Sequence, residues 1–182
     1  MSALSTASIV CVPLDHVLEP MANKVLLSKT CTVRFDNNRY SVLATAVGRP
    51  VDVHAYADRI VIRQDGVIVG DHARAFGRGQ TAYDPWHYVP VLVRKPGALR
   101  NGAPFKDWVL PPAMAAIRRK LKGSDDVDRQ MVQILSCVRD DGLMSVEAVC
   151  REALDQGVRS APVIINILAR SKDAAAPPLL LT

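Results

Sequence analysis

Residues 30–44 of the chain, TCTVRFDNNRYSVLA, alternate apolar and polar side chains on both sides of the polar triplet Asp36-Asn37-Asn38. Such alternation is typical of β-strands that bury one face, since successive side chains of a strand point to opposite sides. Asn and Asp tolerate the positive φ angles that tight hairpin turns demand. The stretch therefore predicts an antiparallel hairpin that turns at residues 36–38.

The same two-residue period continues beyond this hairpin. Three more alternating segments, at residues 51–56, 59–63 and 67–72, are joined by the short turns Ala57-Asp58 and Asp65-Gly66. Short strands connected by tight turns are typical of small antiparallel barrels and rolls. We expect a small antiparallel β-barrel or roll, SH3-like in size, over residues 26–80.

After residue 80 the apolar spacing becomes helical. Asp84 and Pro85 form a good helix start, and they predict a short helix from Trp86 to Lys95. Longer helices are expected at residues 112–122, 128–141, 145–156 and from 160 onward, each with one apolar stripe. The fold class is α+β, a small β-barrel or roll followed by a cluster of short α-helices. The expected divisions are a loose lead-in at 1–25, the β-unit at 26–80, a connecting segment at 81–110, a helical region at 111–173 and a tail at 174–182.

Positive charge is concentrated in the middle of the chain. Residues 27–122 hold 16 Lys and Arg against 7 Asp and Glu, whereas the remainder of the chain is mildly acidic. Such asymmetry points to an anionic partner for the middle and to a different partner for the final third. The alternative is a solvated basic surface without a ligand.

Catalytic and metal-binding patterns are missing from the sequence. The four cysteines and four histidines follow no metal-ligand spacing, and there is no phosphate-binding loop and no nucleophilic serine turn. Asp36, Asp58 and Asp65 fall at turns, and residues 125–128 place three further Asp at a helix start, where capping is the simpler explanation. We expect no catalytic residues, no metal site, no cofactor, no signal peptide and no membrane span.

The basic residues are the candidate contacts to an anion. They fall on predicted strands and turns, in a Gly-rich turn, in the connecting loop and on a helix that carries a dense basic run. In chain order they are Arg34, Arg39, Arg49, Arg59, Arg63, Arg78, Arg100, Lys106, Arg118, Arg119, Lys120 and Lys122. Arg59 and Arg63 are expected to share a strand face with Val61. For the run at 118–122, the solvated face of an amphipathic helix is an equal alternative.

The hairpin sequence Val33-Arg34-Phe35-Asp36-Asn37-Asn38-Arg39-Tyr40-Ser41-Val42 resembles the V-R-F-x-x-N-R-Y-S-V-P pattern of IstA-type insertion-sequence transposases. The later stretches YDPWHYVPVL at 83–92 and RKPGAL at 94–99 resemble the same family, in the same order. The resemblance covers roughly residues 25–170, and it departs from the pattern at Leu43, where the family has Pro.

This resemblance implies that the chain corresponds to one part of a larger transposase. In these transposases, which are related to the transposase of phage Mu, an Asp-Asp-Glu catalytic core precedes a β-barrel and C-terminal helices. The chain resembles only the last two parts, so no catalytic residue is carried over. The family's barrel contacts DNA and helps to assemble the paired-end complex, and its helices are expected to contact the transposase subunit or its ATPase helper.

Two functions of different kinds follow. The first is a non-catalytic transposase fragment that contacts the DNA backbone without sequence preference and helps transposition and integration complexes to assemble. It is expected in the bacterial cytoplasm, associated with the nucleoid. The second is a protein-interaction or inhibitory module, a truncated transposase that pairs with full-length copies. A small enzyme is the remaining alternative.

Overall fold

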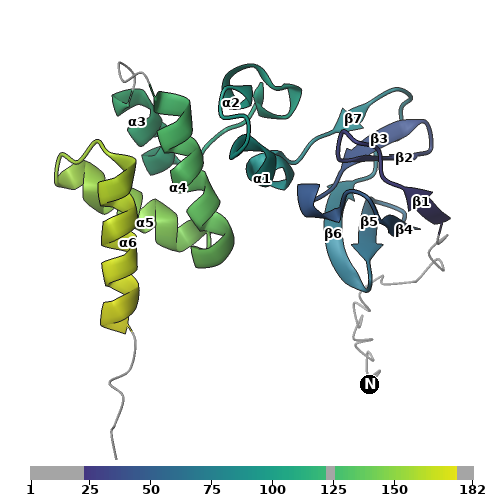
Figure 1. The fold of residues 1–182 in the computed structure, drawn as a ribbon. Coiled ribbons are helices and arrows are strands. Elements are labelled where there is room, and N and C mark those ends of the chain that lie inside the picture. Colours follow the sequence, from purple (N-terminus) through teal and green to yellow (C-terminus); the bar gives the residue numbers. More distant parts are fainter. Residues whose placement is uncertain (1–22, 122–125, 176–182) are drawn as a thin grey trace, which may run out of the picture.

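The computed structural model describes residues 23–121 and 126–175, and these form a β-rich unit followed by a helical unit (Figure 1). Most of the expected lead-in, residues 1–22, lies outside the described residues, as do residues 176–182 of the expected tail. Two boundaries differ from expectation. The first strand already begins at Asn23, and the last helix continues to Ala175.

Within the described part of the chain, the β-unit contains seven strands in two sheets. Their bounds are β1 (Asn23–Leu26), β2 (Thr32–Phe35), β3 (Asn38–Ser41), β4 (Pro50–Ala55), β5 (Arg59–Gln64), β6 (Val67–Ala73) and β7 (Thr81–Ala82). One sheet has the order β1-β4-β5-β6 and is fully antiparallel, and the other has the order β2-β3-β7. Among the described residues the ladders form two sheets and no closed barrel, so the β-unit is a roll. Because helices follow this β-unit along the chain, the expected α+β class is confirmed.

Two of the three predicted tight turns have the positive φ angles that their residues favour. Asp36 and Asn37 have φ angles of 48° and 59°, and Asp65 and Gly66 have 51° and 81°. Two successive positive φ angles match the right-handed twist of the flanking strands, which is why Asn, Asp and Gly occupy these positions. The turn at 36–37 sets the β2–β3 register, in which Val33 pairs with Tyr40.

The small strand β7 was not anticipated, and it runs parallel to β3. Strand β6 ends at Ala73, and residues 74–80 lead the chain back along the hairpin. The backbone N–H of Arg39 donates to the carbonyl of Gln80 at 2.9 Å, which brings β7 beside β3. A two-residue strand formed by such a return has no periodicity that a sequence could reveal.

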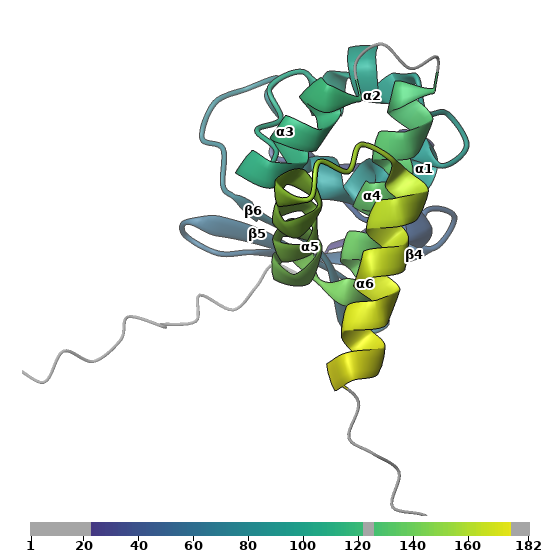
Figure 2. The ribbon, with the colours of Figure 1, turned by 90° about the vertical axis from the view of Figure 1, so that its left-hand side faces the viewer.

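The helical unit begins with short turns and ends with four longer helices. The short elements are η1 (Ala44–Ala46, within the β-unit), η2 (Pro85–Tyr88), α1 (Val89–Leu92), α2 (Ala98–Asn101) and η3 (Ala103–Phe105). The longer ones are α3 (Pro112–Lys120), α4 (Val127–Asp141), α5 (Leu143–Asp155) and α6 (Ala161–Ala175), seen together in Figure 2.

The expected helix from Trp86 to Lys95 is instead a 3₁₀ turn followed by one turn of α-helix. Asp84 caps the turn as predicted, because its carboxylate accepts the backbone N–H of Trp86 at 2.9 Å. The 3₁₀ turn ends at Tyr88, and Pro90 falls in the first turn of α1, where a missing N–H leaves no helical hydrogen bond unmade. The proline therefore divides the segment into two short pieces.

Each unit has its own hydrophobic core. The core of the roll includes Val33, Tyr40, Val53, Ile60 and Ile62, all at most 1% exposed. The larger core of the helical unit extends from Tyr88 to Leu168 along the chain, and it also includes Cys31 from the β-unit. The hydroxyl of Tyr88 donates to the carbonyl of Thr30 at 3.2 Å. The two units are thus joined by packing and by hydrogen bonds as well as by the connecting segment.

Candidate nucleic-acid interface

Two arginines lie directly opposite each other on the outer face of the three-stranded sheet. Arg34 in β2 and Arg39 in β3 are cross-strand partners, next to the hairpin turn. Val33 and Tyr40 point into the core from the same strands, so the alternation of the strands turns both arginines outward. Both are exposed, and neither guanidinium group has a hydrogen bond or an ion pair with any other described residue. Like charges directly opposite each other on neighbouring strands destabilise the sheet. Such a pair is expected where an anion is bound.

Arg78 lies at the same end of this sheet. It is exposed and belongs to the loop 74–80, whose Gly79 N–H donates to the carbonyl of Asn37 in the hairpin turn at 3.0 Å. The loop brings Arg78 to the turn that also carries Arg34 and Arg39. Three basic residues, two from the hairpin and one from the loop 74–80, therefore lie at one end of this sheet.

Arg74 belongs to the same loop, and the sequence reasoning missed it. Its guanidinium donates to the carbonyl of Tyr56 at 3.0 Å, lies 3.7 Å from the carboxylate of Asp36, and sits 6.0 Å from the centre of the Phe35 ring. These contacts hold the loop against the hairpin, so Arg74 positions its neighbours. In the sequence, Arg74 simply follows a predicted strand, and nothing in that position indicates these long-range contacts.

Arg59 and Arg63 share the outer face of β5 with Val61, as the alternation predicted. Their surroundings are less basic than expected, however. The cross-strand partner of Arg63 in β4 is Asp52, and that of Val61 in β6 is Asp71. The guanidinium of Arg59 lies 5.0 Å from the centre of the Tyr56 ring. The carboxylates offset the positive charge of this face.

Two other candidate arginines are engaged in exposed ion pairs. Arg49 lies 2.9 Å from Asp65 and also donates to the side chain of Gln64, and these contacts join the two turns at one end of the four-stranded sheet. Arg100 lies 2.8 Å from Asp128 at the start of α4. Each arginine already has an anionic partner, so neither offers an unopposed positive charge.

The basic run on α3 is only partly available. Arg118 donates to the carbonyl of Leu99 at 3.4 Å, whereas Arg119 and Lys120 are exposed. All three lie in the last turn of the helix, where positive charge is also favoured by the helix dipole. Lys122 lies outside the described residues. Lys106 is exposed in the loop that precedes α3.

A Ser–His–Asp contact, with Ser41 and His87 buried and Asp84 partly exposed, lies where the two units meet. The hydroxyl oxygen of Ser41 is 2.9 Å from Nδ1 of His87, and Nε2 of His87 is 3.6 Å from the carboxylate of Asp84. Ser41 has no exposed surface, and its hydroxyl oxygen also accepts the backbone N–H of Asp84 at 2.8 Å. A nucleophile that no substrate can reach performs no catalysis, so the contact is structural.

The environment of His87 favours its neutral form. Burial lowers its pKa, the Asp84 carboxylate raises it, and the nearby His72 ring, 5.5 Å away, lowers it. Because the Asp84 N–H donates to Ser41, the Ser41 hydroxyl can give its own proton to Nδ1 of His87. The proton of neutral His87 is then on Nε2, which faces Asp84.

The carboxylates of the described chain are not gathered into a metal site. Within residues 23–121 and 126–175, no group of three His, Cys, Asp or Glu side chains could hold a metal ion. At the start of α4, where capping was expected, Asp126 lies 3.2 Å from Arg129 and Asp128 pairs with Arg100. Asp125 lies outside the described residues.

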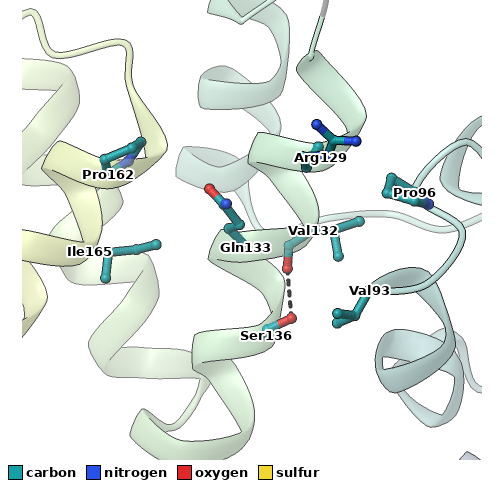
Figure 3. A pocket seen from close by; sticks show the side chains of 8 residues that line it. All are labelled: Val93, Pro96, Arg129, Val132, Gln133, Ser136, Pro162 and Ile165. Carbon is teal, nitrogen blue, oxygen red and sulfur yellow. Dashed lines mark hydrogen bonds between the residues drawn. The ribbon is translucent and has the colours of Figure 1, made fainter.

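An apolar groove follows one side of α4, as Figure 3 shows. One part has a volume of about 720 Å³ between the end of α1, α4 and the start of α6. It is lined by Val93, Pro96, Arg129, Val132, Gln133, Ser136, Pro162 and Ile165. A second part of about 460 Å³ shares Val93 and Ser136 with the first and reaches Trp86 and Leu43.

No helix of the described chain has the length and apolarity that a membrane crossing requires.

Comparison with known proteins places these features in a family. Residues 15–84 match the family model of the Mu transposase, C-terminal domain, and this region contains the hairpin and the loop at 74–80. A transposase of Aminobacter aminovorans is 40% identical over 161 residues. The chain is therefore similar to insertion-sequence transposases over most of its length. The transposase resemblance that the hairpin motif predicted is thereby confirmed.

The relatives are considerably longer than this chain. The match to the Aminobacter aminovorans transposase covers 85% of this chain and 31% of the relative. A transposase for the insertion sequences IS1326/IS1353 of Pseudomonas aeruginosa is 38% identical over 83% of this chain and 30% of its own length, and that of Shigella flexneri gives the same figures. The chain thus spans about a third of the transposases it matches. No solved structure matches it significantly.

Proposed function

We propose that this chain is a DNA-binding, non-catalytic part of a transposase, and that it contacts the phosphate backbone through the hairpin end of the β2-β3-β7 sheet. The observation that carries the proposal is the exposed Arg34–Arg39 pair, which has no anionic partner among the described residues. Phosphates would relieve the repulsion between the two guanidinium groups, and Arg78 adds a third positive charge beside them. Contacts of this kind carry no sequence information, so binding is expected to be independent of sequence.

The basic end of α3 supplies a second set of contacts in this proposal. Arg119 and Lys120 are exposed, whereas Arg118 is held by a backbone carbonyl. We rank this site below the hairpin because its charges also complement the helix dipole, which explains them without DNA. Removing these side chains should weaken binding less than removing the Arg34–Arg39 pair.

The proposed division of labour follows the two cores. Residues 26–80 would hold DNA, residues 81–110 would connect the units, and the helices within 111–173 would contact proteins during assembly of the transposition complex in the bacterial nucleoid. The absence of chemistry is also part of the proposal. It is supported by a family match to a C-terminal domain and by turn and helix-start carboxylates that engage neighbouring arginines.

The deciding experiment is fluorescence anisotropy with a labelled random-sequence duplex, titrated at several salt concentrations. If several phosphates are contacted, log affinity should fall linearly with log salt, with a slope of about 0.9 per contact. The double variant Arg34→Gln/Arg39→Gln should weaken binding and lower the slope by about two contacts. Arg151→Gln/Arg170→Gln, on the exposed surface of α5 and α6, is the matched control and should change neither. Absence of binding at low salt would refute the proposal.

A second function rests on the apolar groove along α4. We propose that another transposase subunit docks there, which would let this chain pair with full-length copies and inhibit them. The supporting observation is that Val93 is 60% exposed at the junction of the two parts of the groove. Copurification of the chain with a full-length transposase should be lost in Val93→Asp and kept in Val109→Asp, which changes an exposed valine elsewhere. Equal recovery of both variants would contradict this function.

A further inference from the structure

Phe76 is the most exposed aromatic side chain of the described residues, with 79% of its surface in solvent. It lies in the loop 74–80 between Arg74 and Arg78. An exposed phenylalanine loses hydrophobic free energy relative to a buried one, and a polar residue would serve equally well in an ordinary loop. Its position therefore calls for a physical explanation.

The loop on either side of Phe76 is fixed by one buried residue. Asn38 has no exposed surface, and its side-chain amide donates to the carbonyl of Ala75 at 3.0 Å and to that of Gly77 at 2.7 Å. Its carbonyl oxygen accepts the backbone N–H of Gln80 at 3.0 Å. The residues before and after Phe76 are thus held to the hairpin, and the ring between them is presented outward from a preorganised backbone.

A third contact fixes the start of the loop. The backbone N–H of Ala75 donates to the hydroxyl of Tyr40, whose ring lies in the core of the roll. Because the main chain is held at residues 75, 77 and 80, the exposure of the Phe76 side chain does not result from a loosely held segment. Ordering a ring before it binds removes part of the entropy that binding would otherwise cost.

Most charges near the ring are positive, and the nearby Asp36 carboxylate lies 3.7 Å from the Arg74 guanidinium. The guanidinium of Arg74 lies 5.6 Å from the centre of the Phe76 ring, on one face. Arg78 is two residues away, and the Arg34–Arg39 pair lies at the same hairpin end. Aromatic faces set among arginines are typical of surfaces on which bases stack while the backbone phosphates are neutralised. A protein partner would have to bring acidic groups to the same place, so nucleic acid is the simpler occupant.

We propose that Phe76 stacks on an unpaired base, so that the hairpin end prefers DNA with an unstacked nucleotide over a continuous duplex. This inference rests on the proposed DNA binding and specifies its ligand. A regular duplex keeps its bases stacked on one another and offers phosphates and groove edges to a bound protein. Only a bulge, a flap or a junction presents the free π-face that the open side of the Phe76 ring can cover.

The test uses 20-base-pair duplexes that carry 2-aminopurine, either as a single bulged nucleotide or within a normal pair. The chain should bind the bulged duplex about 5- to 150-fold more tightly, which corresponds to about 1–3 kcal/mol for one stacked base. Stacking should also quench the 2-aminopurine fluorescence. Phe76→Ala should lose both the preference and the quenching, while its affinity for the continuous duplex and its salt dependence stay unchanged.

Two further variants separate the possible roles of the side chain. Phe76→Tyr keeps a flat ring and should keep both readouts, whereas Phe76→Leu keeps an apolar group of similar size and should lose the quenching. Equal affinity of the unaltered chain for the two duplexes, or unchanged preference in Phe76→Ala, would overturn the inference while leaving DNA binding intact. Loss of preference together with loss of duplex affinity in Phe76→Ala would also overturn it. Failure to bind either duplex would instead refute the proposed function.

Discussion

The hydroxyl of Ser41, at the end of strand β3, lies 2.9 Å from Nδ1 of His87 in the 3₁₀ turn that begins the helical unit. Ser41 also accepts the backbone N–H of Asp84, and its carbonyl oxygen lies 2.6 Å from Nε2 of His72. One small residue of the roll thus satisfies polar groups of both units. The relative position of the two cores is fixed at this point by directional contacts.

Replacing Ser41 with Ala should destabilise the whole chain. The substitution leaves the buried N–H of Asp84 without its acceptor and Nδ1 of His87 without its donor, at a cost of about 1–3 kcal/mol in the free energy of unfolding. Urea unfolding followed by circular dichroism measures the change. Ser145→Ala, at an exposed position of α5, is the control and should change stability by less than about 0.5 kcal/mol. A loss no larger than that of the control would show that the contact contributes little.

His87 makes stability depend on pH. Burial lowers its pKa in the folded chain, with an opposing effect of Asp84 and a further lowering by His72. The unfolded chain therefore takes up a proton near pH 6.5 while folded His87 remains neutral. This contribution to stability is fully present above pH 6.5 and is lost as the pH falls from there toward the lowered pKa of the folded state.

Urea titrations at pH 7.5 and pH 5 measure this dependence. The variant His87→Asn keeps a hydrogen-bonding group near Ser41 but does not titrate. It should be less stable than the parent at pH 7.5, and it should lose less stability between the two pH values. Because the carboxylates are common to both proteins, the difference between them isolates the histidine. A variant that loses as much stability as the parent would assign the effect to other groups.

Glu147 caps a helix to which it does not belong. It lies in α5, and its two carboxylate oxygens accept the backbone N–H groups of Ala113 at 2.7 Å and Met114 at 3.2 Å in the first turn of α3. Pro111 precedes α3 and provides no side-chain cap, so the Glu147 carboxylate takes the place of an N-cap side chain. Glu147→Ala should cost about 0.5–2 kcal/mol in the free energy of unfolding, as loss of a helix cap does.

The charge and the hydrogen bonds of Glu147 can be separated. Glu147→Gln retains one acceptor and removes the negative charge that favours a helix N-terminus, so it should be less harmful than Glu147→Ala. Glu152→Ala, on the exposed side of the same helix, is the matched control. Chemical denaturation of the three variants ranks them, and a Glu147→Ala loss equal to that of Glu152→Ala would contradict the capping role.

Local signals in the sequence predicted local structure well. The turn residues at 36–37 and 65–66 specified positive φ angles that the structure contains, and the capping role of Asp84 followed from its place before a proline. The apolar stripes of α3 to α6 were likewise visible, with boundaries that shift by a few residues. In each case the responsible residues are neighbours in the sequence, so their spacing carries the information.

The features that joined distant segments could not be predicted in this way. The parallel β3–β7 pair, the anchoring of the 74–80 loop by Asn38 and the Ser41–His87 contact each depend on residues that are far apart in the chain. For the same reason, the list of candidate basic residues could not be ranked. Arg34, Arg49 and Arg100 look alike in sequence, and only the fold shows that the last two already have carboxylate partners.

The Arg34–Arg39 pair should reduce stability while it supports DNA binding. Two positive charges directly opposite on adjacent strands repel each other, so Arg34→Gln should raise the free energy of unfolding by about 0.2–1 kcal/mol at low salt. Added salt screens the repulsion, and the gain should shrink accordingly. The same variant should bind duplex DNA more weakly, with a salt slope lower by about one contact. Arg170→Gln, on α6, controls for the loss of one positive charge and should change neither quantity. If Arg34→Gln lowered stability, the two side chains would be contributing packing that outweighs their repulsion, and a bound anion would no longer be needed to explain why both are arginine.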